Sequence, residues 1–196
     1  MGSNCTGQET QANFEPEASK RSKRIKMSES IRTAKSIDSC QIREFTSNNG
    51  YRSALLAHVM LNRYIYFEAT ITSNEGYSRV GFASSGAEIN GPIGMDEHGY
   101  SFGSKNGYMF HKGKRAKYGE RYFKGDIVCC LIFSDGSAQK LTFFVNGEEV
   151  SKKPIDVKPD AYHPAVSVCK NCVLSINVGP YFVFKDKISK KYEFLR

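Results

Sequence analysis

Apolar and polar side chains alternate along Tyr64-Ile65-Tyr66-Phe67-Glu68-Ala69-Thr70-Ile71-Thr72. In an extended chain, successive side chains point to opposite faces. This period separates an apolar face from a polar one, with Ile65, Phe67, Ala69 and Ile71 against Glu68, Thr70 and Thr72. The stretch therefore predicts a β-strand with one buried face.

Further strands are predicted on either side of a tight hairpin. Asn146-Gly147 supplies the two residues with positive φ that a type I′ turn requires. Residues 127–133 are apolar throughout, so this strand should lie centrally with both faces covered. The other candidates are separated by Gly, Pro, Asn and Asp: residues 78–84, 108–111, 141–145, 148–150, 165–168 and 172–178. No segment keeps a helical period over three turns, so we expect an all-β fold of antiparallel strands in two packed sheets.

A glycine-rich segment at residues 91–107 predicts a binding loop. It holds five glycines and Pro92 beside aromatic and singly charged side chains. Such chemistry suits backbone with positive φ and close approach to other chains, which loops on a rigid scaffold provide. The segment favours binding over catalysis.

Length and charge indicate one domain with a basic tail. The 196 residues suffice for one core, and the net charge is +8. Residues 1–36 offer too little apolar surface to offset chain entropy, so we expect a disordered tail at 1–36 and the folded domain at 37–196. The tail's cations suit a nuclear-import signal, a non-specific DNA contact or a solubilising end: Lys20, Arg21, Lys23, Arg24 and Lys26.

The first residues carry a competing localisation signal. Met1-Gly2-Ser3-Asn4-Cys5-Thr6 fits the pattern for N-myristoylation of Gly2, and Cys5 offers a second acylation site. One acyl chain together with a polybasic patch is enough to hold a protein at a membrane. The sequence has no apolar run near the roughly 20 residues that span a bilayer, so we expect a soluble protein of a reducing compartment.

The cysteines indicate buried thiols. Six are present, and their spacing matches neither a secreted disulfide framework nor a zinc site, so we expect no metal and no cofactor. A cysteine hydrolase is the enzymatic alternative, with His58, His111 or His163 as the base. Cys129, Cys130 and Cys172 stand in apolar strand patterns where a thiol is inert, so we expect no enzyme activity.

Several motifs resemble the SPRY (B30.2/SPRY) domain family, whose fold is a bent, concanavalin-like antiparallel β-sandwich. They are Tyr66-Phe67-Glu68, Val80-Gly81-Phe82, Gly125-Asp126-Ile127-Val128 and Phe143-Phe144-Val145-Asn146-Gly147. Within that family, other motifs resemble the Ash/Bre trithorax-group branch. These are Pro92-Ile93-Gly94-Met95-Asp96, Tyr100-Ser101-Phe102-Gly103-Ser104-Lys105, His163-Pro164-Ala165-Val166-Ser167-Val168 and Cys172-Val173-Leu174-Ser175-Ile176-Asn177-Val178-Gly179-Pro180.

This resemblance implies a non-catalytic adaptor subunit of a COMPASS-like histone H3 lysine-4 methyltransferase complex in the nucleus. In that branch, the SPRY domain binds an acidic segment of a WD40-repeat partner, and the pair stimulates a SET-domain subunit. By position, the peptide-binding residues are Tyr51, Arg79, Pro92, Met95 and Lys105. The family usually has tyrosine where Met95 stands and arginine where Gly103 stands.

Two alternatives keep the fold and change the partner. One is a membrane-tethered adaptor acylated at Gly2, and the other is a substrate receptor for ubiquitin ligation. Residues 112–124 carry six cations and Glu120, and we expect them to form a solvated face. Lys112, Lys114 and Arg115 are candidates to replace the missing arginine at position 103, and a different acidic segment in the partner is the alternative.

Overall fold

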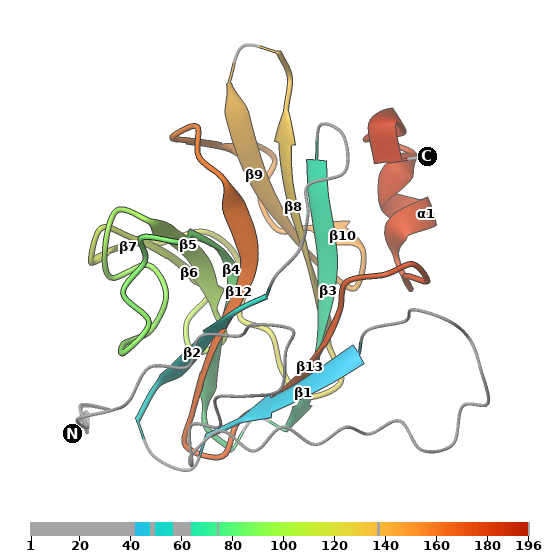
Figure 1. Cartoon of the computed structure of the whole chain (residues 1–196). Coiled ribbons are helices and arrows are strands. Elements are labelled where there is room, and N and C mark those ends of the chain that lie inside the picture. The colour runs from blue at the N-terminus through green and yellow to red at the C-terminus, as the bar shows by residue number, and fades with distance from the viewer. Residues whose placement is uncertain (1–41, 48–49, 57–63, 74, 137, 196) are drawn as a thin grey trace.

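The computed structural model describes residues 42–47, 50–56, 64–73, 75–136 and 138–195. These residues form two antiparallel β-sheets packed face to face, with a short helical segment at the end of the chain (Figure 1). The predicted tail at 1–36 and the predicted domain boundary at 37 lie outside the described residues. None of the described helices is long and apolar enough to cross a bilayer.

The first sheet contains the strand with which the sequence analysis began. Its strands follow one another in the order β1 (Ile42–Thr46), β13 (Val173–Asn177), β3 (Tyr64–Ser73), β8 (Ile127–Ser134), β9 (Gln139–Val145) and β10 (Glu148–Glu149), and β11 (Ile155–Val157) pairs with β9. The turn between β9 and β10 has φ 53° at Asn146 and 75° at Gly147. The predicted hairpin is therefore confirmed, since both residues have the positive φ that a type I′ turn needs.

The second sheet carries the predicted binding residues. Its strand order is β2 (Arg52–Leu55), β12 (Tyr162–Cys169), β4 (Tyr77–Ser84), β5 (Gly99–Gly103), β6 (Tyr108–His111) and β7 (Lys114–Lys117). Two antiparallel sheets packed on one core confirm the predicted β-sandwich.

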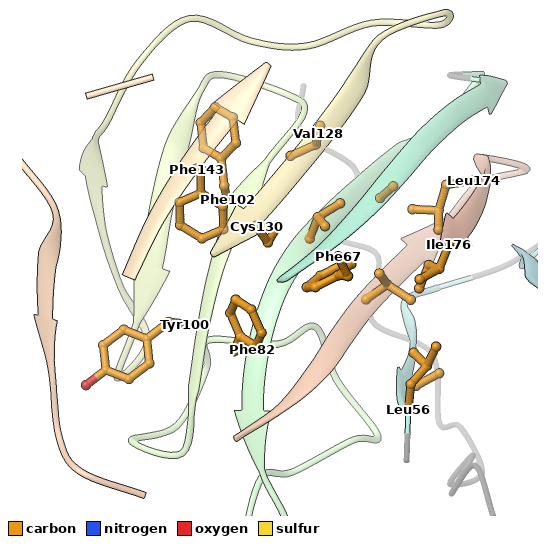
Figure 2. Packing of buried hydrophobic residues seen from close by; sticks show 14 of the residues in the cluster. Leu56, Phe67, Phe82, Tyr100, Phe102, Val128, Cys130, Phe143, Leu174 and Ile176 are labelled. Atoms are coloured by element: carbon orange, nitrogen blue, oxygen red, sulfur yellow. The ribbon is translucent and has the colours of Figure 1, made fainter. Parts of the chain in front are cut away.

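The core lies between the two sheets and follows the period of two. Phe67 of β3 and Phe82 of β4 meet edge to face there, with ring centroids 5.2 Å apart (Figure 2). Ile65, Ala69 and Ile71 line the same core, as the alternation predicted. Burial of such side chains supplies most of the favourable free energy of folding.

The opposite face of β3 is also covered, which corrects the prediction of one buried face. Tyr66 and Glu68 are buried, because the C-terminal segment with α1 (Lys185–Ser189) and η1 (Glu193–Leu195) packs over this side. Ile188 and Leu195 of that segment share a cluster with Leu131 of β8. The prediction that β8 is central and covered on both faces is therefore confirmed.

A second correction concerns residues 99–103, which the sequence analysis placed in a loop. They form β5, with Tyr100 and Phe102 pointing into the core and Gly99, Ser101 and Gly103 on the outer face. A Cβ at Gly99 would lie 2.9 Å from Ile93 Cγ2, so glycine here permits close packing against the preceding loop. Gly99 and Gly103 serve close packing on a strand, whereas Gly94 (φ 92°) and Gly107 (φ 66°) of the same segment have the positive φ that was predicted.

Glu68 fixes the C-terminal segment to the first sheet. Its carboxylate accepts the backbone N–H groups of Val183 (2.8 Å) and Phe184 (2.7 Å) and the hydroxyl of Tyr66 (2.8 Å). The side chain is only 2% exposed, so these donors replace the water that the carboxylate loses. Ion pairs of Lys187 with Glu148 and of Lys191 with Glu149 attach the segment further along.

We expect Glu68→Ala to lower the free energy of unfolding by about 3 kcal/mol, because it removes the acceptor of three donors, of which the Tyr66 hydroxyl is buried. Urea denaturation measures the change. The exposed Glu75 provides the matched control, for which Glu75→Ala should stay within about 0.5 kcal/mol of the wild type. Equal stability of the Glu68 and Glu75 variants would contradict the anchoring role.

Candidate peptide-binding surface

The candidate surface lies on the outer face of the second sheet. Val80 and Phe82 of β4 point into the core, so the intervening residues of this strand point away from it. Arg79 is among them and pairs in register with Ser167 of β12 and Gly103 of β5. It therefore stands near the middle of the sheet, with the loop between β4 and β5 over it.

Three serines hold this loop against the sheet. The N–H of Ile93 donates to Ser167 Oγ (2.8 Å), and Ser101 Oγ donates to the Ile93 carbonyl (2.6 Å). Ser53 Oγ donates to the Gly91 carbonyl (2.5 Å) and lies 2.9 Å from Ser167 Oγ. Ile93 itself is buried. The loop is therefore fixed by hydrogen bonds to side chains of β2, β5 and β12.

Arg79 contacts both the loop and two aromatic rings. Its Nη1 donates to the Ile93 carbonyl (3.0 Å), and its guanidinium carbon lies 3.6 Å from the ring centre of Phe110 and 5.4 Å from that of Tyr51. Burial lowers the pKa of this guanidinium, which still keeps its charge at neutral pH. Only 9% of the residue is exposed, so the neighbouring loop and aromatic rings cover most of the guanidinium.

Tyr51 and Met95 border the same guanidinium. Burial raises the pKa of the Tyr51 hydroxyl, which lies beside the Cys169 thiol and near Arg79, so this tyrosine stays neutral. Met95 Sδ lies 3.8 Å from Arg79 Nη1, and 51% of the residue is exposed. The structure thus brings Tyr51, Arg79 and Met95 together, although they come from distant parts of the sequence.

The other two predicted residues lie at the margin of this group. Pro92 is half-buried in the loop, directly before Ile93. Lys105 is exposed in the turn after β5, and its Nζ lies 4.8 Å from the ring centre of Tyr77 on β4. Lys105 therefore stands beside the Arg79 group rather than within it.

Phe110 is a residue of this surface that the sequence analysis did not single out. Its strand, β6, was predicted, and the register of Ser101 with Phe110 puts the ring on the outer face beside Arg79. A Cβ at Gly103 would lie 2.8 Å from Phe110 Cε2, so the ring occupies the space that a side chain at position 103 would need. The signal available in the sequence was an aromatic residue on the predicted strand at 108–111, which lies two strands from the strand of Arg79 in the sheet.

The remaining predicted sites are placed as follows. Gly2, Cys5 and the cations Lys20, Arg21, Lys23, Arg24 and Lys26 lie outside the described residues. Residues 114–117 form β7 and are exposed, as expected of a solvated face. Position 103 lies on β5, and β6 stands between that strand and β7.

The thiols of the described residues are buried, as predicted. Cys129, Cys130, Cys169 and Cys172 are buried thiols that form no disulfide. Burial raises the pKa of Cys129 to about 12 and that of Cys172 to about 11, and it also raises the pKa of Cys130. The described ranges contain no group of three His, Cys, Asp or Glu side chains arranged to hold a metal ion.

We expect Arg79→Ala to lower the free energy of unfolding by about 1 to 2 kcal/mol, because a donor to the Ile93 carbonyl and a stacked cation are lost. Hydrogen exchange should become faster in residues 91–98. Lys105→Ala is the matched control, since Lys105 is exposed and should change neither quantity. Unchanged exchange in the Arg79 variant would show that the three serines fix the loop alone.

We expect the four buried thiols to resist N-ethylmaleimide at pH 8 in the native protein. With a pKa of about 11, only about one Cys172 thiol in a thousand is ionised at that pH. Peptide mass spectrometry should find these cysteines unlabelled, and labelled after treatment with guanidinium chloride. Rapid native labelling of Cys129 would contradict its burial under the C-terminal segment.

Comparisons with known proteins agree with this fold. The SPRY domain family matches residues 64–181. The crystal structure of a human SPRY domain superimposes with a TM-score of 0.54 at 17% identity, over 74% of this chain and 90% of that chain, which shows a shared fold.

Similar curated proteins include two histone methyltransferase subunits. The Set1/Ash2 histone methyltransferase complex subunit ASH2 of Drosophila melanogaster is 23% identical over 184 residues, covering 72% of this chain and 33% of the relative. The corresponding Caenorhabditis elegans subunit ash-2 is 24% identical over 190 residues, covering 70% and 33%. Ran-binding protein 9 of Xenopus laevis is 29% identical over 124 residues, covering 61% of this chain and 22% of the relative. The chain thus spans about a third of the first two relatives. Because the family match covers most of the sandwich, the chain belongs to the SPRY domain family.

Proposed function

We propose that the protein is a non-catalytic adaptor subunit of a histone methyltransferase complex that acts on lysine 4 of histone H3. Two similar SPRY-containing proteins are named as subunits of Set1/Ash2 histone methyltransferase complexes, which supports this class of assembly. Both alignments cover about 70% of this chain, so the similarity extends over most of the sandwich. In this proposal, methyl transfer belongs to a separate SET-domain subunit.

The surface around Arg79 is proposed to bind an acidic segment of a WD40-repeat subunit. The observation that carries this proposal is the convergence of Tyr51, Arg79 and Met95, with exposed Lys105 beside them. Arginine and lysine donate charge-assisted hydrogen bonds to carboxylates, and aromatic and thioether side chains contribute apolar contact at low entropic cost. The partly buried Arg79 strengthens an electrostatic contact relative to one in open water.

Phe110 alters what this surface offers compared with the family pattern. With glycine at position 103, a cation is missing, and the aromatic ring of Phe110 lies against Arg79 instead. The ring holds the guanidinium in a fixed plane, which lowers the entropy that binding must remove. The protein therefore combines one ordered arginine with exposed lysines, and its partner needs carboxylates for both.

The proposed function places the protein in the nucleus, where histones are methylated. Lys20, Arg21, Lys23, Arg24 and Lys26 are the proposed import signal, and they are also available for non-specific contact with DNA. Acylation at Gly2 and Cys5 is the competing proposal, because it would direct the same fold to a membrane. Stimulation of the SET subunit is proposed to follow from holding the WD40 partner in place.

We expect a fluorescent glutamate-rich peptide to bind the full chain with an affinity that falls as salt rises, because the charged contacts are screened. Lys105→Ala should weaken binding about threefold, the size of an exposed charge contact. Fluorescence anisotropy measures both effects. Because Lys105 is exposed, the melting temperature should not change.

Lys190→Ala is the matched control for this experiment. Lys190 is exposed and follows α1, which lies across the molecule from β7 (Figure 1). Its loss removes the same charge without touching the proposed surface, so affinity should remain at the wild-type value. If both lysine variants lose affinity equally, the peptide is responding to net charge alone and the proposed surface is wrong.

A further inference from the structure

Two lysines converge on one tyrosine next to the Arg79 group. The Nζ of Lys105 lies 4.8 Å from the ring centre of Tyr77, and the Nζ of Lys170 lies 5.9 Å from it. Tyr77 begins β4, Lys105 follows β5, and Lys170 follows β12, so three separate strands bring these residues together. We call Tyr77, Lys105 and Lys170 the lysine pair site.

The lysine pair site is ordered by the strands that carry it. Tyr77 pairs in register with Cys169, the residue before Lys170. Lys170 and Asn171 have φ of 51° and 59°, and the N–H of Cys172 donates to the Cys169 carbonyl (3.2 Å), so Lys170 stands in a tight turn. Contact with an aromatic face attracts ammonium groups and limits their motion. Both ammonium groups therefore lie beside the same tyrosine ring.

The backbone positions of Tyr77 and Arg79 have the spacing of alternate residues in an extended peptide. Tyr77 and Arg79 are two residues apart on β4 and share its outer face. Two residues of a strand rise about 7 Å, and the side chains of residues i and i+2 in any extended chain are separated by the same amount on one face. A segment lying along β4 can thus direct alternate side chains to Arg79 and to the lysine pair site.

The exposure of Arg79 favours a peptide over a nucleic acid. Its guanidinium stands between Tyr51, Met95 and Phe110 with 9% of the residue exposed. An anion that reaches it must be carried on a narrow, flexible stem, as the carboxylate of glutamate is. A backbone phosphodiester has no such stem, although it would be attracted to Lys105 and Lys170.

We propose that the lysine pair site is a second anion subsite, so that the surface selects extended acidic segments whose carboxylates occupy positions i and i+2. This inference rests on the proposed function, since it specifies which acidic segments the Arg79 surface accepts. Adjacent carboxylates at i and i+1 point to opposite faces of an extended chain, and only one of them reaches the surface. Selectivity for alternation therefore separates this subsite from general attraction to negative charge.

The test compares peptides of equal composition on the full chain by fluorescence anisotropy. A Glu-Ser-Glu peptide should bind about threefold more tightly than a Glu-Glu-Ser peptide in the same neutral context, the size of one exposed charge contact. Lys170→Glu should weaken the alternating peptide by about tenfold, since an attraction becomes a repulsion. Lys190→Glu, the matched reversal beyond α1, should leave its affinity unchanged. Far-ultraviolet circular dichroism confirms that each variant is folded.

A charge swap identifies the contact directly. Either Lys-Ser-Glu or Glu-Ser-Lys should bind the Lys170→Glu variant more tightly than it binds the wild type, and the peptide that does so gives the direction of the chain along β4. Failure of both peptides to gain affinity overturns the subsite.

The remaining outcomes distinguish failure of this inference from failure of the proposed function on which it rests. Equal affinity for the alternating and adjacent peptides, with Lys105→Ala weakening both, overturns the subsite and leaves the proposed function standing. No binding of any acidic peptide overturns both proposals. Tighter binding of a single-stranded oligothymidine than of the alternating peptide, with loss of that binding in Lys170→Glu, assigns the lysine pair to nucleic acid and overturns the peptide subsite.

Discussion

The contact between Phe67 and Phe82 across the sandwich determines the orientation of everything on the second sheet. The two rings meet edge to face in the core, and each belongs to a central strand of its own sheet (Figure 2). Because side chains on a strand alternate, burying Phe82 sends Arg79 and Tyr77 to the outer face. A slip of one residue would exchange the buried and exposed sets, so the register of the core also specifies the binding surface.

Small polar side chains on that outer face form the hydrogen bonds that hold the loop between β4 and β5 against the sheet. Ser53, Ser101 and Ser167 come from three strands and hold the loop that contains Ile93. Larger residues at these positions would push the loop away from Arg79. Arg79 in turn donates one hydrogen bond to the loop, so folding already orients the cation that the proposed function uses for recognition. Such ordering before binding is a general route to affinity without additional contacts.

The sequence was most informative where one physical rule dominates. Alternation along residues 64–72, the apolar run at 127–133 and Asn146-Gly147 each followed a local rule, and the predicted sandwich was correct. Glu68 was assigned to an exposed face because its carboxylate is polar. Its burial depends on backbone donors more than a hundred residues away, which no local pattern reveals.

On the candidate surface, too, some residues could be predicted from the sequence and others could not. The family resemblance supplied a set of five residues: Tyr51, Arg79, Pro92, Met95 and Lys105. The structure places Tyr51 and Met95 beside Arg79. Phe110 and Lys170 escaped notice because their roles come from cross-strand pairing. Residues 99–103 were assigned to a loop because glycine is ambiguous: it marks positive φ in one setting and close packing in another.

The anchoring of the C-terminal segment sets the extent of the unit that folds. The family match ends at residue 181, two residues before the N–H groups that Glu68 accepts. A protein cut at that boundary would leave a buried carboxylate without its donors and would expose Leu131 and Phe144 to water. The boundary of the recognisable family and the boundary of cooperative folding therefore differ, and expression of an isolated domain should extend through Leu195.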